Sequence, residues 1–249
     1  MKEWILGRNP VYETLRANRR HVFRLRVAER VEEKGRLGEA VRMAERRNLL
    51  LEVVPRRQLD SLGDGHQGVA LEVSGYPYSA LPEMLSLAAS RSEPPLILIL
   101  DTLQDPQNLG TLLRSAEALG VHGVLLPMRR TATVTPAVVS ASAGASEHLL
   151  IAQANLAQAI AILKGAGVWV IGLDASPEGK TPEDLDLSGP LALVVGSEGE
   201  GMRPLVRKSC DALLHLPMRG QVASLNAAVA GSVALYLACR VRGYSQPRP

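Results

Sequence analysis

The sequence predicts an α/β protein in two parts: a small N-terminal α/β domain, and a C-terminal domain with a mostly parallel sheet and helices on both faces. From residue 95 onward, short apolar runs alternate with segments of helical spacing, which is typical of parallel strands joined by helices. The first 75 residues carry helical and strand-like patterns of their own. Gly75-Tyr76-Pro77 and the polar, proline-containing stretch 90–95 indicate a break between them. We therefore expect an N-terminal domain at 1–75, a linker at 76–94 and a C-terminal domain at 95–249.

The elements of the small domain follow from local periodicity. Apolar residues recur with helical spacing at 10–18 and at 35–48, where the outer face is rich in arginine. Aliphatic and β-branched runs predict strands at 22–28, 49–54 and 68–73. A further short helix is expected at 81–89, inside the linker.

The C-terminal domain shows stricter alternation. Its strands are continuous apolar runs, as expected when both faces of a sheet are covered; they are expected at 96–100, 123–126, 149–152, 168–173, 191–195 and 212–216. Helical spacing between them predicts helices at 108–119, 136–146, 155–165, 202–209 and 224–241.

Composition excludes several classes of protein. Apolar residues make up 46% of the chain, which is enough for a packed core, and the apolar runs are too short to span a bilayer. The start Met1-Lys2-Glu3 is not the apolar core of a signal peptide, so we expect a cytoplasmic protein. Cys210 and Cys239 form neither a disulfide framework nor a metal-ligand spacing, and they are expected to be buried thiols with no metal site.

The positive charge is unevenly distributed. The net charge is +3, and residues 1–75 hold 15 Lys and Arg against 11 Asp and Glu, so the excess lies in the first third. Guanidinium groups suit phosphate contacts, although a basic helix is also commonly a solvated face. Aromatic residues are only 3%, which argues against binding by stacking many unpaired bases. An RNA partner would be recognised mainly through its backbone and shape.

Three polar clusters each come directly after an apolar strand run. They are 105–110, which leads into the helix carrying Arg114; 196–201; and 216–226, which contains Leu216-Pro217-Met218 and Ser224-Leu225-Asn226. Ligands of open α/β sheets bind beyond the carboxyl ends of the strands, so we expect the site there. Taken singly, each cluster has a structural alternative. Asn108 or Ser224 could be a helix N-cap, and the glycine loop at 196–201 could be an ordinary connection between a strand and a helix. The glycine spacing fits neither nucleotide-binding fingerprint, which disfavours a nucleotide-dependent oxidoreductase.

These residues resemble a known family. Asn108-x-Gly110 with Arg114, Gly196-x-Glu198-Gly199-x-Gly201, and Leu216-Pro217-Met218 with Ser224-Leu225-Asn226 are similar to the three motifs of the SpoU (TrmH) group of SPOUT methyltransferases, in the same order across 96–243. The segment Gly7-Arg8-Asn9-Pro10-Val11 and the elements after it resemble the ribosomal-protein-like substrate-binding domain of the bacterial 23S rRNA guanosine 2′-O-methyltransferases of this group.

The resemblance implies an S-adenosyl-L-methionine-dependent enzyme that methylates a ribose 2′-hydroxyl of structured RNA, most similar to the enzymes acting on a guanosine of 23S rRNA. It also implies a deep trefoil knot in the C-terminal domain, which periodicity alone does not predict because knots are nearly absent from proteins. The knotted edge would pair with a second subunit, giving a homodimer. A tRNA ribose methyltransferase and a catalytically inactive RNA-binding relative stay open as alternatives.

The resemblance also assigns residues. Cofactor binding would fall to Gly196, Gly201, Leu216, Met218 and Leu225, and the catalytic group would be Asn108, Arg114, Glu198, Ser224 and Asn226. RNA contacts are expected from Arg8, Arg129, Arg130 and Arg219.

Several of these assignments have structural alternatives. Leu216 and Leu225 could equally be core residues, and Glu198 could be a buried partner of Arg203; His215 is not counted as a site residue. A guanidinium stays protonated at any accessible pH, so we interpret Arg114 as a clamp on the RNA phosphate rather than a general base.

Overall fold

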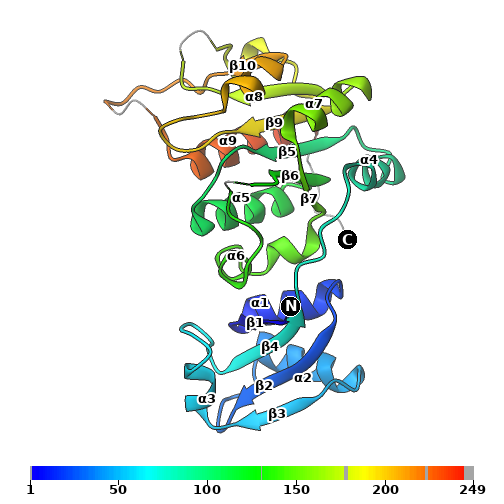
Figure 1. Ribbon diagram of the computed structural model, residues 1–249, viewed down its shortest axis with the longest axis vertical. Helices are drawn as coiled ribbons and strands as arrows, with labels where there is room; N and C mark the ends of the chain where they lie inside the picture. The colour runs from blue at the N-terminus through cyan, green and yellow to red at the C-terminus, as the bar shows by residue number, and fades with distance from the viewer. Residues whose placement is uncertain (1, 130, 177–178, 222–223, 244–249) are drawn as a thin grey trace. The chain divides into compact units, whose positions relative to one another are not determined.

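The computed structural model describes residues 2–129, 131–176, 179–221 and 224–243 (Figure 1). Contacts divide the chain into two units, Met1–Pro77 with Val134–His148, and Tyr78–Thr133 with Leu149–Pro249. The chain therefore passes between the units three times, and residues 134–148 leave the second unit to join the first. Arg130 lies outside the described residues. The functional division into 1–75, 76–94 and 95–249 stays a prediction.

The first unit is built on a four-stranded sheet in the order β1-β4-β2-β3. The strands are β1 (Lys2–Leu6), β2 (Val22–Ala28), β3 (Leu51–Val54) and β4 (Val69–Ser74), and only β2 and β3 pair in parallel. The unit also contains α1 (Arg8–Ala17), α2 (Arg36–Arg46), α3 (Arg56–Asp60), α6 (Pro136–Ala141) and the 3₁₀ helix η1 (Ala145–His148). The periodicity did not predict β1 or α3.

A buried ion pair holds η1 within the first unit. Arg20 donates from Nε to Glu147 Oε2 at 2.9 Å and from Nη2 to Glu147 Oε1 at 2.8 Å. The side chain of Arg20 is 0% exposed and that of Glu147 is 1% exposed. Arg20 also reaches Glu3 at 2.8 Å, and the Tyr76 hydroxyl donates to the Ser146 carbonyl at 3.0 Å. The pair is thus desolvated and doubly hydrogen-bonded, which is the geometry that a buried charge requires.

The second unit contains a six-stranded, wholly parallel sheet in the order β10-β8-β9-β5-β6-β7. Its strands are β5 (Leu96–Leu100), β6 (Gly123–Pro127), β7 (Ile151–Ala154), β8 (Trp169–Leu173), β9 (Leu191–Val195) and β10 (Ala212–Leu214). Every residue of β5, β6 and β9 is buried, which is why these segments read as continuous apolar runs. The predicted parallel sheet is confirmed.

Helices cover both faces of this sheet. One apolar cluster joins the strands to α4 (Leu81–Ser90), α7 (Leu156–Gly165) and α8 (Pro204–Ser209). On the other face, α5 (Pro106–Ala118) and α9 (Ala227–Val241) lie side by side (Figure 1). Gly231 permits this close packing, since a Cβ there would lie 2.6 Å from Leu112 Cδ2. The 3₁₀ helix η2 (Pro182–Asp184) precedes β9.

Three of the predicted helix boundaries differ from the structure for a reason that the backbone or a cap explains. The helix expected at 136–146 ends at Ala141, because Ala143 and Gly144 adopt positive φ values of 53° and 89° and break it. The helix expected from 108 begins at Pro106, and Asp105 rather than Asn108 caps it. The last helix begins at Ala227 with Asn226 as its cap, so Ser224 precedes the helix rather than capping it.

Within the described ranges, no helix is both long and apolar enough to cross a bilayer, and no cluster of three His, Cys, Asp or Glu side chains could hold a metal ion. Cys210 and Cys239 are free thiols. Burial raises the pKa of each thiol to about 11, so neither is a reactive thiolate at neutral pH.

Candidate active site

The three polar clusters meet at the carboxyl edge of the six-stranded sheet. The first comes after β5, the second after β9 and the third after β10. In the sheet, β9 pairs with β5 on one side and with β8 on the other, and β10 pairs with β8. The strand order therefore brings together segments that are about a hundred residues apart in the chain.

A hydrogen-bonded trio joins the three clusters. Asn108 Nδ2 donates to Glu198 Oε1 at 3.0 Å, and Asn226 Nδ2 donates to Asn108 Oδ1 at 3.1 Å. Asn226 Nδ2 also donates to Glu198 Oε1. Because Asn226 Oδ1 accepts from the amides of Ala228 at 2.9 Å and Val229 at 3.2 Å, this side chain also caps α9. The trio thus fixes the first turns of α5 and α9 to the glycine loop after β9.

A cavity of about 660 Å³ opens beside this trio. Its walls include every residue predicted to be catalytic or cofactor-binding except Arg114 and Asn108: Gly196, Glu198, Gly201, Leu216, Met218, Ser224, Leu225 and Asn226. Leu225 is 40% exposed and lines the cavity, so it is not the core residue that one alternative held it to be. The volume lies within the usual range for small-molecule sites.

The glycine loop at 196–201 is a closed turn rather than a plain connection. Ser197 and Gly201 exchange backbone hydrogen bonds of 3.0 and 3.1 Å, and Gly201 has a φ of 69°. A Cβ at Gly196 would lie 2.2 Å from the carbonyl carbon of Gly201. Only glycine fits there, and the turn presents backbone groups to the cavity at close range.

Sequence reasoning missed three polar residues that line the cavity: Asp174, Arg207 and His215. Arg207 Nε donates to Asp174 Oδ2 at 2.7 Å, and the Ser176 amide donates to Asp174 Oδ1 at 2.8 Å. Burial alone would raise the pKa of Asp174, but these hydrogen bonds outweigh it and hold the pKa below its usual value. Asp174 comes directly after β8, so the rule that found the other clusters could have found it as well.

His215 carries an unsatisfied polar atom. Its Nδ1 is buried and has no hydrogen-bond partner among the residues that the structure describes. An unpaired buried nitrogen is costly and therefore needs an explanation, and a ligand that bonds to it is one. His215 precedes Leu216 and lines the same cavity. The structure therefore places it beside the predicted site residues, from which it had been left out.

Arg114 stands apart from the cavity. It is exposed on α5, where its side chain makes no hydrogen bond or ion pair within the described parts of the chain. The alternative partner for Glu198 is also ruled out, because Arg203 pairs with Asp101 at 2.7 Å instead. Among the described residues, nothing therefore occupies the Arg114 guanidinium, which is accessible to a phosphate.

The expected RNA contacts are scattered. Arg129 and Arg219 are exposed, and Arg129 lines a second cavity. Arg8 donates from Nε to the Gln67 carbonyl at 3.2 Å, so part of its guanidinium is already engaged. Arg130 cannot be placed, since it is outside the described residues.

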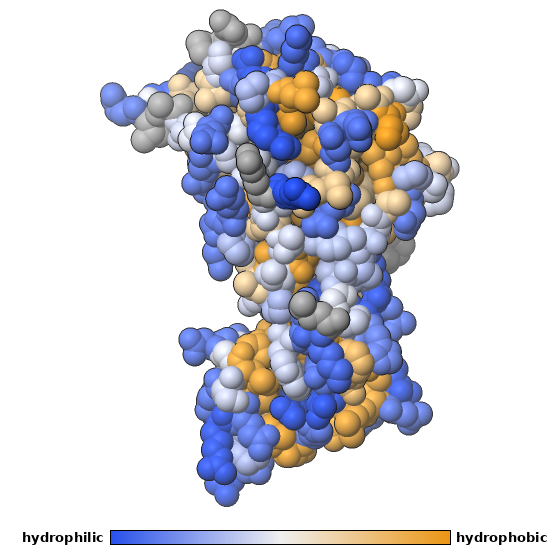
Figure 2. All heavy atoms as spheres, in the orientation of Figure 1, coloured by the Kyte–Doolittle hydropathy of each residue, from blue (hydrophilic) through white to orange (hydrophobic). Residues whose placement is uncertain are grey.

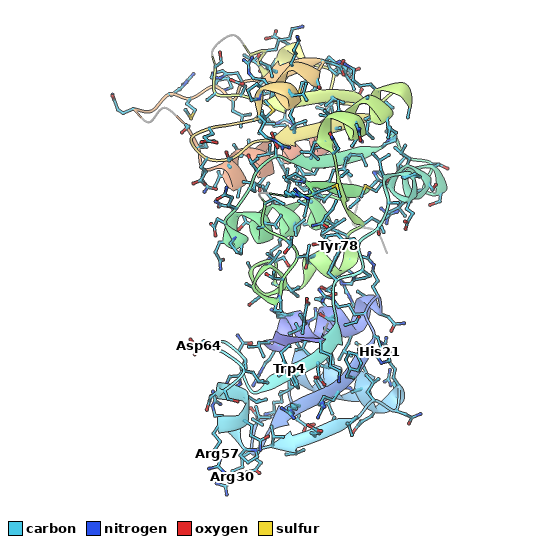
Figure 3. All side chains as sticks on the ribbon, viewed as in Figure 1. Trp4, His21, Arg30, Arg57, Asp64 and Tyr78 are labelled. Carbon is cyan, nitrogen blue, oxygen red and sulfur yellow. The ribbon has the colours of Figure 1, made fainter. Side chains whose placement is uncertain are left out.

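The first unit offers further arginines that the sequence did not single out. Figure 3 shows Arg30 and Arg57 projecting outward at one end of that unit. Both side chains are exposed, so their guanidinium groups are accessible to a phosphate.

The chain was compared with known families and proteins. The SpoU rRNA methylase family matches residues 95–236, and the family of RNA 2′-O ribose methyltransferase substrate-binding domains matches residues 4–79. YacO of Bacillus subtilis, a protein assigned to the TrmH family of tRNA/rRNA methyltransferases, is 41% identical over 242 residues, covering 96% of each chain. A tRNA/rRNA methyltransferase of Mycobacterium avium is 45% identical over 236 residues, covering 94% of this chain and 75% of its own length.

Solved structures show the same fold. The SpoU methyltransferase AviRb of Streptomyces viridochromogenes, in complex with AdoMet, superposes with a TM-score of 0.81 at 24% identity, covering 98% of this chain and 92% of that one. The AdoMet-bound rRNA methyltransferase of Sinorhizobium meliloti superposes with a TM-score of 0.77 at 24% identity, covering 96% and 87%. With the family matches, the ordered motifs and the cavity at the strand ends, this chain belongs to the SpoU (TrmH) family of AdoMet-dependent RNA methyltransferases.

Proposed function

We propose that this protein transfers the methyl group of AdoMet to a ribose 2′-hydroxyl of structured RNA, and that the methylated nucleotide is a guanosine of 23S rRNA. The observation that carries the proposal is the 660 Å³ cavity, whose walls bring the second and third motifs together beside the first. Its backbone-rich turn at 196–201 and the unsatisfied His215 nitrogen are the features that a bound nucleoside would engage. AdoMet, when bound, supplies a methyl group activated by its sulfonium charge.

The chain's own residues divide into binding and positioning roles. Gly196, Leu216 and Leu225 would hold the adenosine through backbone groups and apolar contact. Asn108, Glu198 and Asn226 bond chiefly to one another, so they position the two helices and the glycine loop. This arrangement pre-organises the cavity before substrate arrives, which reduces the ordering cost of binding.

Arg114 would hold the RNA. A protonated guanidinium makes two parallel hydrogen bonds to phosphate oxygens, and such a clamp on the phosphate beside the target ribose would aim the 2′-oxygen at the methyl carbon. Since Arg114 cannot release a proton at neutral pH, the hydroxyl proton would pass to that phosphate or to an ordered water.

The choice of RNA can be tested directly. Transfer of tritiated methyl from AdoMet would be measured on transcripts of 23S rRNA and on unmodified tRNA, and the product nucleotide would be mapped. The separate N-terminal domain, which matches the family of RNA 2′-O ribose methyltransferase substrate-binding domains at residues 4–79, argues for ribosomal RNA through the resemblance alone. Methylation of tRNA alone would establish the tRNA alternative, and binding without transfer to either RNA would establish the inactive relative.

We also propose a homodimer formed through α9. Val229, Val233 and Tyr236 recur on one side of this helix and are 47%, 39% and 60% exposed, which leaves an apolar stripe in water. We expect Val233→Asp with Tyr236→Glu to convert a dimer into a monomer, as measured by light scattering. The matched control is Ile162→Asp, which changes a 57% exposed apolar side chain on another helix, α7. A monomeric unmodified protein would refute the proposal.

His215 gives a prediction about the cofactor. We expect His215→Ala to weaken AdoMet binding about tenfold, because it removes the one buried side-chain nitrogen that lacks a partner among the described residues. His215→Asn should recover part of the affinity, since its amide lies near the position of Nδ1. Calorimetric titration would measure both, with His21→Ala, an exposed histidine of the first unit, as the control. Equal affinities for His215→Ala and the unmodified protein would contradict this role.

Two further expectations stay predictions: the trefoil knot of the C-terminal domain, which the family resemblance implies, and the cytoplasmic location, which was inferred from the N-terminal sequence.

A further inference from the structure

A second cavity, of about 590 Å³, lies in the second unit. Its walls come from the segment after β6, the segment joining β7 to α7, and α8. Because β6 and β7 pair in parallel, their ends lie at the same carboxyl edge of the sheet as the candidate active site. The two cavities are neighbours along residues 202–207, since Met202 and Arg207 line the first, and Arg203 and Val206 line the second.

We propose that this second cavity binds one unstacked nucleotide of the RNA substrate, near the nucleotide that is methylated. Its base would lie between Met128 and Leu205, and its phosphate would pair with Arg129. The inference rests on the proposed RNA substrate and adds a recognition site that the three family motifs do not include.

The apolar walls fit the face of a base. Met128 is 69% exposed and Leu205 is 65% exposed, and both flank the cavity. Figure 2 shows apolar surface beside hydrophilic surface on the second unit. Large apolar side chains left in water at the rim of a cavity indicate a binding surface. Methionine is flexible and polarisable, so it packs well against flat aromatic groups, and sequence-specific proteins commonly bind RNA bases that are unstacked.

The charge of the cavity fits a phosphate. Arg203 is fixed by Asp101, which accepts from its amide at 2.8 Å and from its Nε at 2.7 Å, so most of its charge is compensated. Arg129 is exposed and has no hydrogen bond or ion pair within the described residues, which leaves one uncompensated positive charge at the rim. An apolar cleft with one free guanidinium complements a nucleotide, which carries a flat base and one phosphate charge.

The neighbouring backbone is held in place. The Ala132 amide donates to the Leu103 carbonyl at 2.7 Å, and the Thr131 hydroxyl donates to the same oxygen at 2.9 Å. Leu103 itself is buried. On the opposite wall, Asn155 Oδ1 accepts from the Gln158 amide at 3.3 Å, which leaves its NH₂ group to donate to a base edge. These hydrogen bonds hold the segments that flank the cavity.

The experiment measures RNA affinity of the full chain, saturated with S-adenosylhomocysteine to prevent turnover, for a labelled 23S rRNA transcript over a range of salt concentrations. The variants are Met128→Ser, Leu205→Ser, the two combined, and Arg129→Ala. Ile162→Ser removes an exposed apolar side chain elsewhere on α7, and Arg91→Ala removes a positive charge just before β5, at the opposite edge of the sheet. These two are the matched controls.

We expect Met128→Ser and Leu205→Ser each to weaken RNA binding by about three- to tenfold. The double variant should lose less than the product of the two, because both side chains contact one base. Arg129→Ala should lower the slope of log affinity against log salt by about one. AdoMet affinity and unfolding temperature should not change, since the substituted side chains are exposed and lie outside the first cavity.

The inference is overturned if all four variants bind RNA with affinities within twofold of the affinity of the unmodified protein. This holds even if some other molecule binds in the cavity. The proposed function is judged separately, by methyl transfer from the unmodified protein to the same transcript. Transfer with normal RNA binding by the variants would reject only the second cavity. Failure of the unmodified protein to methylate any RNA would reject the proposed function itself.

Discussion

Arg114→Lys is expected to lower kcat on RNA about a hundredfold while leaving AdoMet affinity unchanged. Lysine keeps the positive charge but loses the planar fork that makes two parallel hydrogen bonds to a phosphate. Loss of one such contact at a reacting centre costs a factor of about a hundred or more. Arg114 does not line the 660 Å³ cavity, so cofactor binding should not respond. Single-turnover methyl transfer and calorimetric titration would measure the two quantities.

The matched control is Arg91→Lys, which makes the same chemical change away from the carboxyl edge of the sheet and should leave kcat within twofold. Near-full activity of Arg114→Lys would show that positive charge alone suffices and would refute the proposed role of Arg114 as a two-pronged phosphate clamp. A tenfold or larger fall in AdoMet affinity would instead place Arg114 in the cofactor site.

Glu147→Gln is expected to lower the free energy of unfolding of the first unit by about 3 kcal/mol. The substitution keeps the shape of the side chain but leaves the guanidinium of Arg20 buried beside a neutral group, and removing one partner of a buried pair costs about 3–5 kcal/mol. Glu3, the other partner of Arg20, is 19% exposed and recovers part of that cost. Calorimetric melting would detect the loss as an earlier transition of the first unit.

Two comparisons separate this effect from ordinary surface electrostatics. Glu39→Gln breaks the exposed pair of Arg36 and Glu39, whose atoms lie 3.0 Å apart, and should cost less than about 1 kcal/mol. Arg20→Met combined with Glu147→Leu should recover most of the stability, because apolar groups of similar size replace a buried pair at little cost. A melting curve for Glu147→Gln that matches the unmodified protein would show that water reaches the pair.

Local sequence determined most of the elements, because a strand covered on both faces must be apolar throughout. The runs at 96–100 and 191–195 coincide with β5 and β9 for that reason. The local pattern failed to predict helix ends, because these are set by backbone conformation and by capping hydrogen bonds. Positive φ values at Ala143 and Gly144 end α6 early, and capping by Asp105 and Asn226 sets the true starts of α5 and α9.

The position of the candidate site could be predicted to the extent that its residues come directly after the strands. Polar clusters after apolar strands lie at one edge in any parallel sheet, so eight of the ten residues expected to bind cofactor or catalyse line one cavity. Resemblance supplied the methyl donor and the ribose, which periodicity cannot reveal. Asp174 was within reach of the same rule, but His215 was not, because the burial of one ring nitrogen depends on side chains distant in the chain.

The sequence by itself determined the parallel sheet, the edge of the sheet at which the candidate site lies and the residue types present there. Only the tertiary structure decided the order β10-β8-β9-β5, which lets Asn226 reach Asn108 across 118 positions. It also assigned residues 134–148 to the first unit through the pair of Arg20 and Glu147, 127 positions apart. Local periodicity records which face of an element is buried; it holds no information about which distant segment buries it.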